Sequence, residues 1–188
     1  MSEHRLKPAV FLDRDGTISE EVGYLNHVSR FHMFPFAAAA IRKLNESGLL
    51  VFVITNQSGV ARGYYPESLV HAVHDWMTIR LGDTGAYLDG IYYCPHTSAD
   101  ACACRKPAPG MLHRASCEHG VDLTRSFVVG DRHSDVELAH RVGARSIMVR
   151  TGYGEGEILW HAQEWAIMPD FIAADLTAAA DWILEQTR

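Results

Sequence analysis

The chain has 188 residues, of which 47% are hydrophobic, and it carries a formal net charge of -6 at pH 7. This length fills one core well and is too short for two large domains, so we expect a single domain over residues 1–188. The excess of 23 acidic over 17 basic residues argues against a protein that binds nucleic acid by neutralising many phosphates.

The sequence gives no sign of a membrane or export signal. No uninterrupted apolar run reaches the about 18 residues of a membrane span, and the N-terminal residues lack the apolar core of a signal peptide. We therefore expect a cytoplasmic chain without a membrane partner.

Strand and helix signals alternate along the chain. The run Leu-Leu-Val-Phe-Val-Ile-Thr at 49–55 is typical of a central parallel strand. The expected strands are 8–12, 49–55, 88–94, 126–129 and 144–149. The expected helices are 35–47, 66–81, 109–118, 134–142 and 176–186, and a loop with three glycines follows the last strand. This alternation predicts an α/β fold with a Rossmann-like, doubly wound parallel sheet and helices on both faces.

Two carboxylates, Asp13 and Asp15, follow the first expected strand. Residues i and i+2 of an extended chain point the same way, and Gly16 then lets the chain turn, so both carboxylates can face one pocket. There, Asp13 can attack phosphorus, while Asp15 protonates the leaving oxygen and later deprotonates the attacking water. An ordinary Asp-Gly turn is the structural alternative.

Other polar clusters also sit where strands end. Thr-Asn-Gln-Ser at 55–58 follows the second strand, Asp131 follows a later one, and Arg105-Lys106 lies just before a helix. Ligands of parallel sheets bind at the carboxyl ends of the strands, so we expect these clusters to converge on one edge.

The order Asp-x-Asp-Gly-Thr, Thr-Asn-Gln-Ser, Arg-Lys-Pro and Gly-Asp-x-x-Ser-Asp resembles the haloacid dehalogenase (HAD) superfamily over residues 10–152. The resemblance implies an Mg²⁺-dependent phosphatase with an aspartyl-phosphate intermediate. Asp13 would be the nucleophile and Asp15 the acid/base, with Thr55 and Lys106 stabilising the phosphoryl group.

The same resemblance implies a magnesium site. Asp13, Asp131 and the backbone carbonyl of Asp15 would hold the ion, since oxygen ligands suit this hard cation. Asp135 would instead orient a water or Lys106.

Three cysteines and one histidine lie within eleven residues: Cys94, His96, Cys102 and Cys104. Three soft thiolates and an imidazole suit a tetrahedral Zn²⁺, and a site closed by four protein ligands is structural. A disulfide from Cys94 is the alternative, but a chain without an export signal belongs in a reducing compartment. We expect Cys117 to be a small core residue.

The Cys-x-His and Cys-x-Cys loop that leads into Arg-Lys-Pro resembles the subfamily of histidinol-phosphate and heptose-bisphosphate phosphatases. Segments 55–63, 89–96 and 105–111 are similar to the heptose-bisphosphate branch, whereas the histidinol-phosphate enzymes usually carry Asp in place of Ser58. The resemblance implies removal of the 7-phosphate of D-glycero-D-manno-heptose 1,7-bisphosphate, in nucleotide-activated heptose synthesis for lipopolysaccharide or a related glycan. Histidinol phosphate, in histidine biosynthesis, is the alternative substrate.

The resemblance also implies a set of substrate contacts. They are Glu21, Val22, Gly23, Tyr24, Asn56, Gln57, Ser58, Arg105 and Arg132. Arg105, aided by Arg132, would bind the second phosphate, since an arginine fork matches phosphate geometry. Arg62 is the alternative contact for that phosphate, in which case Arg105 pairs with a surface carboxylate.

The spacing of the motifs leaves no room for a separate cap domain between Asp15 and Thr55 or between Thr55 and Lys106. We therefore expect a capless enzyme with an open site for a small sugar bisphosphate, and hydrolysis rather than a mutase reaction. A non-catalytic, zinc-stabilised sugar-phosphate-binding protein is the alternative from another class. We expect a monomer, with the tail at 153–188 either packed on the sheet or forming a dimer contact.

Overall fold

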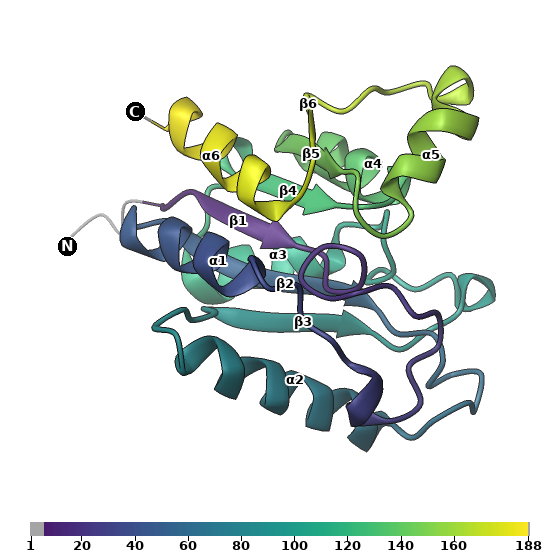
Figure 1. Cartoon of the computed structure of the whole chain (residues 1–188). Helices are drawn as coiled ribbons and strands as arrows, with labels where there is room; N and C mark the ends of the chain where they lie inside the picture. Colours follow the sequence, from purple (N-terminus) through teal and green to yellow (C-terminus); the bar gives the residue numbers. More distant parts are fainter. Residues whose placement is uncertain (1–5, 188) are drawn as a thin grey trace.

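The chain folds around one parallel sheet with helices on both faces, as the computed structural model, which describes residues 6–187, shows (Figure 1). The strand order is β3-β2-β1-β4-β5-β6. The strands are β1 (Ala9–Leu12), β2 (Leu50–Asn56), β3 (Gly90–Cys94), β4 (Phe127–Gly130), β5 (Arg145–Val149) and β6 (Phe171–Ala173). The helices are α1 (Ala37–Glu46), α2 (Glu67–Gly82), α3 (Gly110–His119), α4 (His133–Val142), α5 (Gly154–His161) and α6 (Leu176–Gln186). The predicted α/β fold class is confirmed.

The sheet has an apolar core on each face because successive strand residues point to opposite sides. Val10 and Leu12 of β1 pack into a core that also takes residues of α1, α2 and α6. Ala9 and Phe11 belong to a second core, shared with α3 and α4. In Figure 1, α1, α2 and α6 lie in front of the sheet and α3 lies behind it. The central strands are therefore buried on both sides, which explains their unbroken apolar runs.

The topology determines where a site can form. The chain runs outward from β1 to β2 and β3, and then returns to place β4 beside β1. Leu12 pairs with Val129, and the backbone N–H of Asp13 donates to the carbonyl of Val129 at 2.8 Å. The carboxyl ends of β1 and β4 thus meet at the point where the strand order reverses, which is where doubly wound sheets bind ligands.

The intervals that flank the second strand are short. Between β1 and β2, the structure describes one three-ten helix, Val28–Arg30, and α1. Between β2 and Lys106 it describes α2, β3 and a second three-ten helix, Ser98–Asp100. Neither interval contains a further domain. Over the described residues, no helix is long and apolar enough to cross a membrane.

The C-terminal region departs from the sequence prediction in detail. The loop expected to contain three glycines is already helical from Gly154, where α5 begins, and β6 was not predicted. The tail packs on the sheet, which was one of the two expected alternatives: β6 pairs with β5, and α6 lies against α1. Cys117 is exposed, so its expected place in the core is wrong: it lies on the outer side of α3, whose buried residues are Met111, Leu112 and Ala115.

Candidate active site

The ends of β1, β2 and β4 open into a cavity of about 420 Å³. Most of the predicted site residues line it, namely Asp13, Asp15, Glu21, Gly23, Tyr24, Thr55, Asn56, Gln57, Ser58, Arg105, Lys106, Asp131 and Arg132. Asp13, Thr55 and Asp131 lie at strand ends, and the loop before α3 brings Lys106 to the same edge. The expected convergence of the polar clusters is therefore present in the fold.

Lys106 is a buried cation at this site. Its side chain is 3% exposed, and its Nζ lies 2.9 Å from Oδ2 of Asp13 and 2.7 Å from Oδ1 of Asp135. Burial opposes a charged ammonium, but the two carboxylates outweigh it and raise the pKa of Lys106. The lysine therefore stays protonated and can neutralise charge that develops on a phosphoryl group.

The carboxylates outnumber the cation that pairs with them. Oxygens of Asp13, Asp131 and Asp135 lie within 4.8 Å of one another, and all three residues are buried. Burial raises the pKa of Asp13 to about 7 and that of Asp131 to about 8, and mutual repulsion adds to both shifts. Three close carboxylates facing one ammonium leave an excess of negative charge, which a divalent cation would relieve.

Asp15 is held separately from this cluster. Its carboxylate accepts hydrogen bonds from the guanidinium of Arg14, with Nη2 at 2.8 Å from Oδ2, and from Nε2 of Gln57 at 2.9 Å. The same Gln57 amide donates to Oγ1 of Thr55 at 2.8 Å, which leaves the hydroxyl proton of Thr55 free for another acceptor. Tyr65 donates to the amide oxygen of Gln57 at 3.1 Å and so fixes its orientation.

Asp131 lies in a gap between two glycines. A Cβ on Gly16 would lie 2.0 Å from Oδ2 of Asp131, and a Cβ on Gly152 would lie 2.2 Å from the same atom. The backbone N–H of Tyr153 donates to this oxygen at 2.8 Å, and the hydroxyl of Thr151 donates to the carbonyl of Gly16 at 2.6 Å. The loop after β5 therefore joins the loop after β1 around the carboxylate of Asp131.

The loop that carries Lys106 is fastened to β2 and to the cysteine segment. The side-chain amide of Asn56 accepts from the N–H of Lys106 at 3.0 Å and donates to its carbonyl at 3.3 Å. Nη1 of Arg105 donates to the carbonyl of His96 at 3.0 Å. Asn56, expected as a sugar contact, thus has its amide engaged in positioning the backbone of Lys106.

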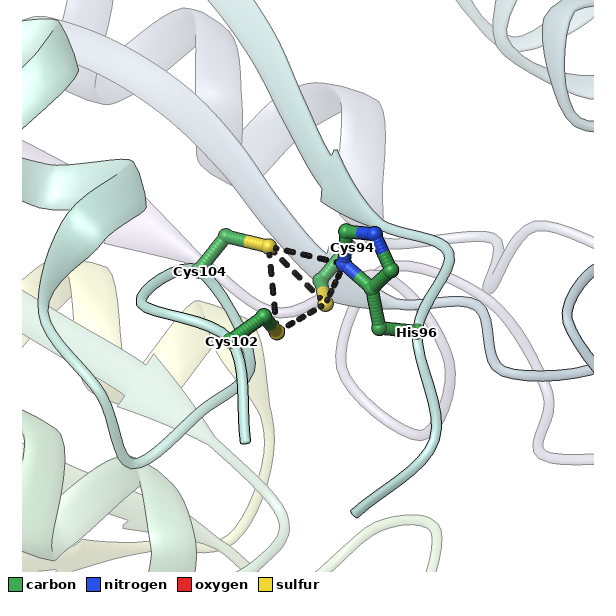
Figure 2. A group of neighbouring side chains, drawn as sticks. All are labelled: Cys94, His96, Cys102 and Cys104. Atoms are coloured by element: carbon green, nitrogen blue, oxygen red, sulfur yellow. Dashed lines mark hydrogen bonds between the residues drawn. The ribbon is translucent and has the colours of Figure 1, made fainter. Parts of the chain in front are cut away.

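The four predicted zinc ligands form a single cluster (Figure 2). Sγ of Cys94 lies 3.1 Å from Sγ of Cys104 and 3.5 Å from Sγ of Cys102, and Nδ1 of His96 lies 3.3 Å from Sγ of Cys104. None of these cysteines forms a disulfide. One nitrogen and three sulfurs gathered at this spacing match the donor set of a closed, tetrahedral metal site.

The outer part of the cavity contains the remaining expected contacts. The guanidinium of Arg132 stacks on the ring of Tyr153, 3.6 Å from its centroid, and lies 3.7 Å from Glu157. Val22 does not line the cavity, because its side chain packs against the core. Arg62, the alternative phosphate contact, is exposed and lies outside the lining residues.

Sequence reasoning missed some lining residues: Tyr65, Ser134 and Tyr153. Ser134 belongs to the Gly-Asp-x-x-Ser-Asp motif and could have been found there. Tyr65 and Tyr153 lie in loops outside the quoted motifs, so only the fold places them at the site.

Comparison with known proteins identifies a group of similar chains. Residues 103–179 match the family described as HAD-hydrolase-like. The chain is 42% identical to the D-glycero-D-manno-heptose-1,7-bisphosphate 7-phosphatase of Thermosynechococcus vestitus, over 94% of this chain and 95% of that protein. It is 38% identical to the D-glycero-beta-D-manno-heptose-1,7-bisphosphate 7-phosphatase of Escherichia coli K12, over 85% of this chain and 88% of that protein.

A solved structure is similar in fold and in sequence. The D,D-heptose 1,7-bisphosphate phosphatase of B. bronchiseptica, in complex with magnesium and phosphate, aligns with a TM-score of 0.86 and 32% identity. The alignment covers 95% of this chain and 99% of that one. The two chains therefore share their fold over nearly their whole length.

Proposed function

We propose a substrate and a mechanism for this chain, which belongs to the HAD-like hydrolases and is a phosphatase of that family. It removes the 7-phosphate of D-glycero-D-manno-heptose 1,7-bisphosphate, a small sugar bisphosphate, in the synthesis of nucleotide-activated heptose for lipopolysaccharide or a related glycan. The observation that carries the chemistry is the Asp13 carboxylate, held 2.9 Å from the buried ammonium of Lys106 in a cavity that Asp15 also lines. The relatives named as heptose-bisphosphate phosphatases support the substrate.

The proposed reaction has two displacements at phosphorus. In the first, a carboxylate oxygen of Asp13 forms a bond to phosphorus as the bond to the sugar oxygen breaks, and Asp15 gives its proton to that leaving oxygen. In the second, Asp15 takes a proton from water, whose oxygen attacks phosphorus and releases inorganic phosphate together with a free Asp13. Lys106 and the hydroxyl of Thr55 stabilise the charge on the phosphoryl oxygens in both steps.

We propose that Asp13, Asp131 and the backbone carbonyl of Asp15 hold Mg²⁺. The donor set fits, since it is made of oxygens and carries more negative charge than Lys106 balances. Asp135, at 2.7 Å from Lys106, then orients the lysine. When bound, the ion supplies a positive charge beside the phosphoryl group.

We propose a structural Zn²⁺ on Cys94, His96, Cys102 and Cys104. Cys104 directly precedes Arg105 and Lys106 in the chain, and Arg105 donates to the carbonyl of His96. A metal on these ligands would fix the loop that holds both cations over the site. This arrangement supports a stabilising role for the metal rather than a chemical one.

The outer cations support a substrate with two phosphates. Arg105 and Arg132 line the same cavity as Lys106, and Glu157 and Tyr153 hold the guanidinium of Arg132 in place. We propose that Arg105, aided by Arg132, binds the phosphate that is not transferred, and that Glu21, Gly23, Tyr24, Gln57 and Ser58 surround the sugar. We also propose that the chain acts as a single-domain monomer in the cytoplasm.

The experiment that tests the substrate compares two phosphate esters in the presence of Mg²⁺. We expect kcat/KM for D-glycero-D-manno-heptose 1,7-bisphosphate to exceed that for histidinol phosphate by about 100-fold, or roughly 2.7 kcal/mol of transition-state discrimination. The reverse preference would assign the chain to histidine biosynthesis and leave the chemistry of Asp13 untouched. Asp13→Asn serves as the control, because full turnover by this variant would contradict the aspartyl-phosphate mechanism itself.

A further inference from the structure

Arg14, between the two catalytic carboxylates in sequence, is among the largest fully buried side chains in the described chain, at 1% exposure. It is a charged residue whose burial needs an explanation, because an unpaired buried cation is strongly unfavourable. The guanidinium points toward Asp15: Nε lies 3.2 Å from Oδ1, and Nη2 lies 3.1 Å from Oδ1 and 2.8 Å from Oδ2. This two-point contact fixes both the position and the plane of the carboxylate.

The opposite side of the guanidinium is held by other parts of the fold. Nη1 of Arg14 lies 3.3 Å from Nε2 of His74, a buried residue of α2. Arginine has only donors, so Nε2 of His74 must be the acceptor and the ring must be neutral. Burial, with the nearby guanidinium, lowers the pKa of His74 to about 3, in agreement with a neutral ring. The ring of Phe31 lies 5.5 Å from the guanidinium carbon.

The backbone alone would leave the direction of the Asp15 side chain open. β1 ends at Leu12, and Asp15 lies in the loop that follows, directly before a turn at Gly16 with φ +80°. The carboxylate has a 17% exposed side chain and lines the cavity, where rotation would turn its oxygens away from the substrate. With Gln57 as a third donor, the Arg14 fork removes that freedom. A general acid must lie within hydrogen-bond reach of the oxygen that it protonates.

We propose that Arg14 and His74 are positioning residues that aim the Asp15 carboxylate at the leaving oxygen, an inference that rests on the proposed phosphatase mechanism. Arg14 makes the contact with Asp15, and His74 on α2 prevents the guanidinium from turning. Helix α2 thereby takes part in catalysis, although it contributes no side chain to the cavity wall.

This role can be separated from a purely structural one by the leaving group of the substrate. A sugar phosphate releases a poor leaving group that needs a proton, whereas p-nitrophenyl phosphate releases a phenolate that needs little acid assistance. Misdirecting Asp15 should therefore slow the sugar phosphate selectively. General collapse of the site would slow both substrates alike.

The experiment measures kcat/KM for both substrates in Arg14→Met, His74→Leu and His74→Gln. We expect Arg14→Met to lower kcat/KM for heptose 1,7-bisphosphate by about 100-fold and that for p-nitrophenyl phosphate by less than about 5-fold. His74→Leu should show the same selectivity with a smaller loss. His74→Gln should recover most of the activity, since an amide oxygen can accept from Nη1. Equal losses on both substrates, or none, would overturn the proposal.

Two further variants complete the design. His71→Leu is the matched control, because His71 lies one turn away on α2, contacts Tyr93, and should leave the ratio of the two rates unchanged. If Arg14→Met does not fold, the pair of His74 variants still decides the outcome.

Asp15→Asn separates the positioning role from the mechanism on which it rests. The comparison follows the first displacement alone, as the burst of released sugar or p-nitrophenol, because loss of the base role in the second displacement would stop turnover of both substrates. If Asp15→Asn slows this burst equally for both substrates, the acid role of Asp15 fails. If it loses only the sugar phosphate while the Arg14 and His74 variants lose neither, the positioning role alone fails.

Discussion

At the scale of single residues, the candidate site places several buried carboxylates close together, which is electrostatically unfavourable. Asp13, Asp131 and Asp135 are buried beside one another, and Lys106 is the cation that pairs with Asp13 and Asp135. Close like charges destabilise a folded protein unless a counterion binds. The arrangement makes sense when the carboxylates are needed for phosphoryl transfer and for a metal, and it should make the stability of the metal-free protein depend on pH.

The first prediction concerns that pH dependence. Burial raises the pKa of Asp13 to about 7 and of Asp131 to about 8, so between pH 6.5 and 8 the folded metal-free protein binds more protons than the unfolded chain. The free energy of unfolding must then fall as pH rises through this window. His74, with its pKa lowered to about 3, acts in the opposite direction, but only below the ordinary histidine pKa of about 6.5.

Thermal unfolding at a series of pH values, with a chelator present, measures this effect. Wild-type Tm should fall from pH 6.5 to 8, and Mg²⁺ should restore it most at the upper end. Asp131→Asn, which keeps an oxygen for the N–H of Tyr153, should have a flatter profile. Parallel profiles for the two proteins would contradict the assignment of the slope to Asp131.

At the scale of elements, the loop between β5 and α5 supports the proposed metal site. Gly152 has φ +60°, and a Cβ on it would lie 2.5 Å from Cα of Gly16 and 2.2 Å from Oδ2 of Asp131. We expect Gly152→Ala to push Asp131 aside and to weaken Mg²⁺ binding by at least about 10-fold, roughly the 1.4 kcal/mol of one lost good contact. Isothermal titration calorimetry with Mg²⁺ in the absence of substrate measures the affinity of wild type and of Gly152→Ala.

Gly156→Ala is the control in the same segment. The nearest atom to its Cβ would be Cδ1 of Trp160 at 4.0 Å, and the residue lies inside α5, where alanine is the better helix former. Mg²⁺ affinity should be unchanged and Tm equal or higher. If both glycine variants bind Mg²⁺ like wild type, the loop does not position Asp131.

The cysteine loop gives a second prediction at this scale. Cys102→Ser should lower the zinc content below one per chain and reduce Tm, because a structural metal contributes its binding energy to folding. It should also reduce kcat/KM, since Lys106 lies two residues after Cys104. Mass spectrometry measures the zinc content of this variant. Cys117→Ser is the control, because Cys117 is an exposed cysteine outside the cluster. One zinc per chain in Cys102→Ser would show that the four-ligand site is wrong.

These elements also show what a sequence can reveal. The buried strands and the polar residues that follow them could be predicted, because the apolar runs and the motifs lie next to each other in the chain. Helix α5 was missed since Gly154 and Gly156 disfavour a helix, whereas the fold requires glycine at 154: a Cβ there would lie 1.7 Å from the carbonyl oxygen of Val149. Strand β6, only Phe171–Ala173, is too short for a periodic signal.

The same limit applies to the site. Asp13, Asp15, Lys106 and Asp131 belong to contiguous motifs and were predictable. The contact between His74 and Arg14 joins residues 60 positions apart, and it depends on how α2 packs against the loop after β1. Such partners follow from the tertiary structure, since nothing in the local pattern around His74 distinguishes it from a core histidine.

At the scale of the whole molecule, the carboxyl and amino ends of the strands form two different edges of the sheet, one with the candidate site and one with an aromatic group. The carboxyl edge gathers the buried charges of the site. Toward the amino edge, Trp182 of α6 stacks on Phe171 with centroids 5.0 Å apart and meets Phe127, at the start of β4, edge-on at 6.2 Å. The guanidinium of Arg145, at the start of β5, lies 4.9 Å from the same ring. This aromatic group fastens the C-terminal segment to the sheet, far along the strands from Asp13 and Asp131.

Because the aromatic group lies away from the cavity, a change in it should affect stability and leave activity intact. Trp182→Ala should remove packing from a half-buried aromatic side chain and lower the free energy of unfolding by about 2 kcal/mol, less than the about 3–5 kcal/mol of a fully buried one. The kcat/KM of the folded variant should stay within about twofold of wild type, because no residue of the aromatic group lines the cavity. Urea denaturation and steady-state kinetics on the same preparations measure the two quantities.

Trp160→Ala is the control for both measurements. The side chain of Trp160 is 76% exposed, so its removal breaks few contacts and should change neither stability nor kcat/KM. A loss of activity in Trp182→Ala without a loss of stability would mean that the two edges are coupled through the strands, and that the amino edge helps to position the catalytic residues.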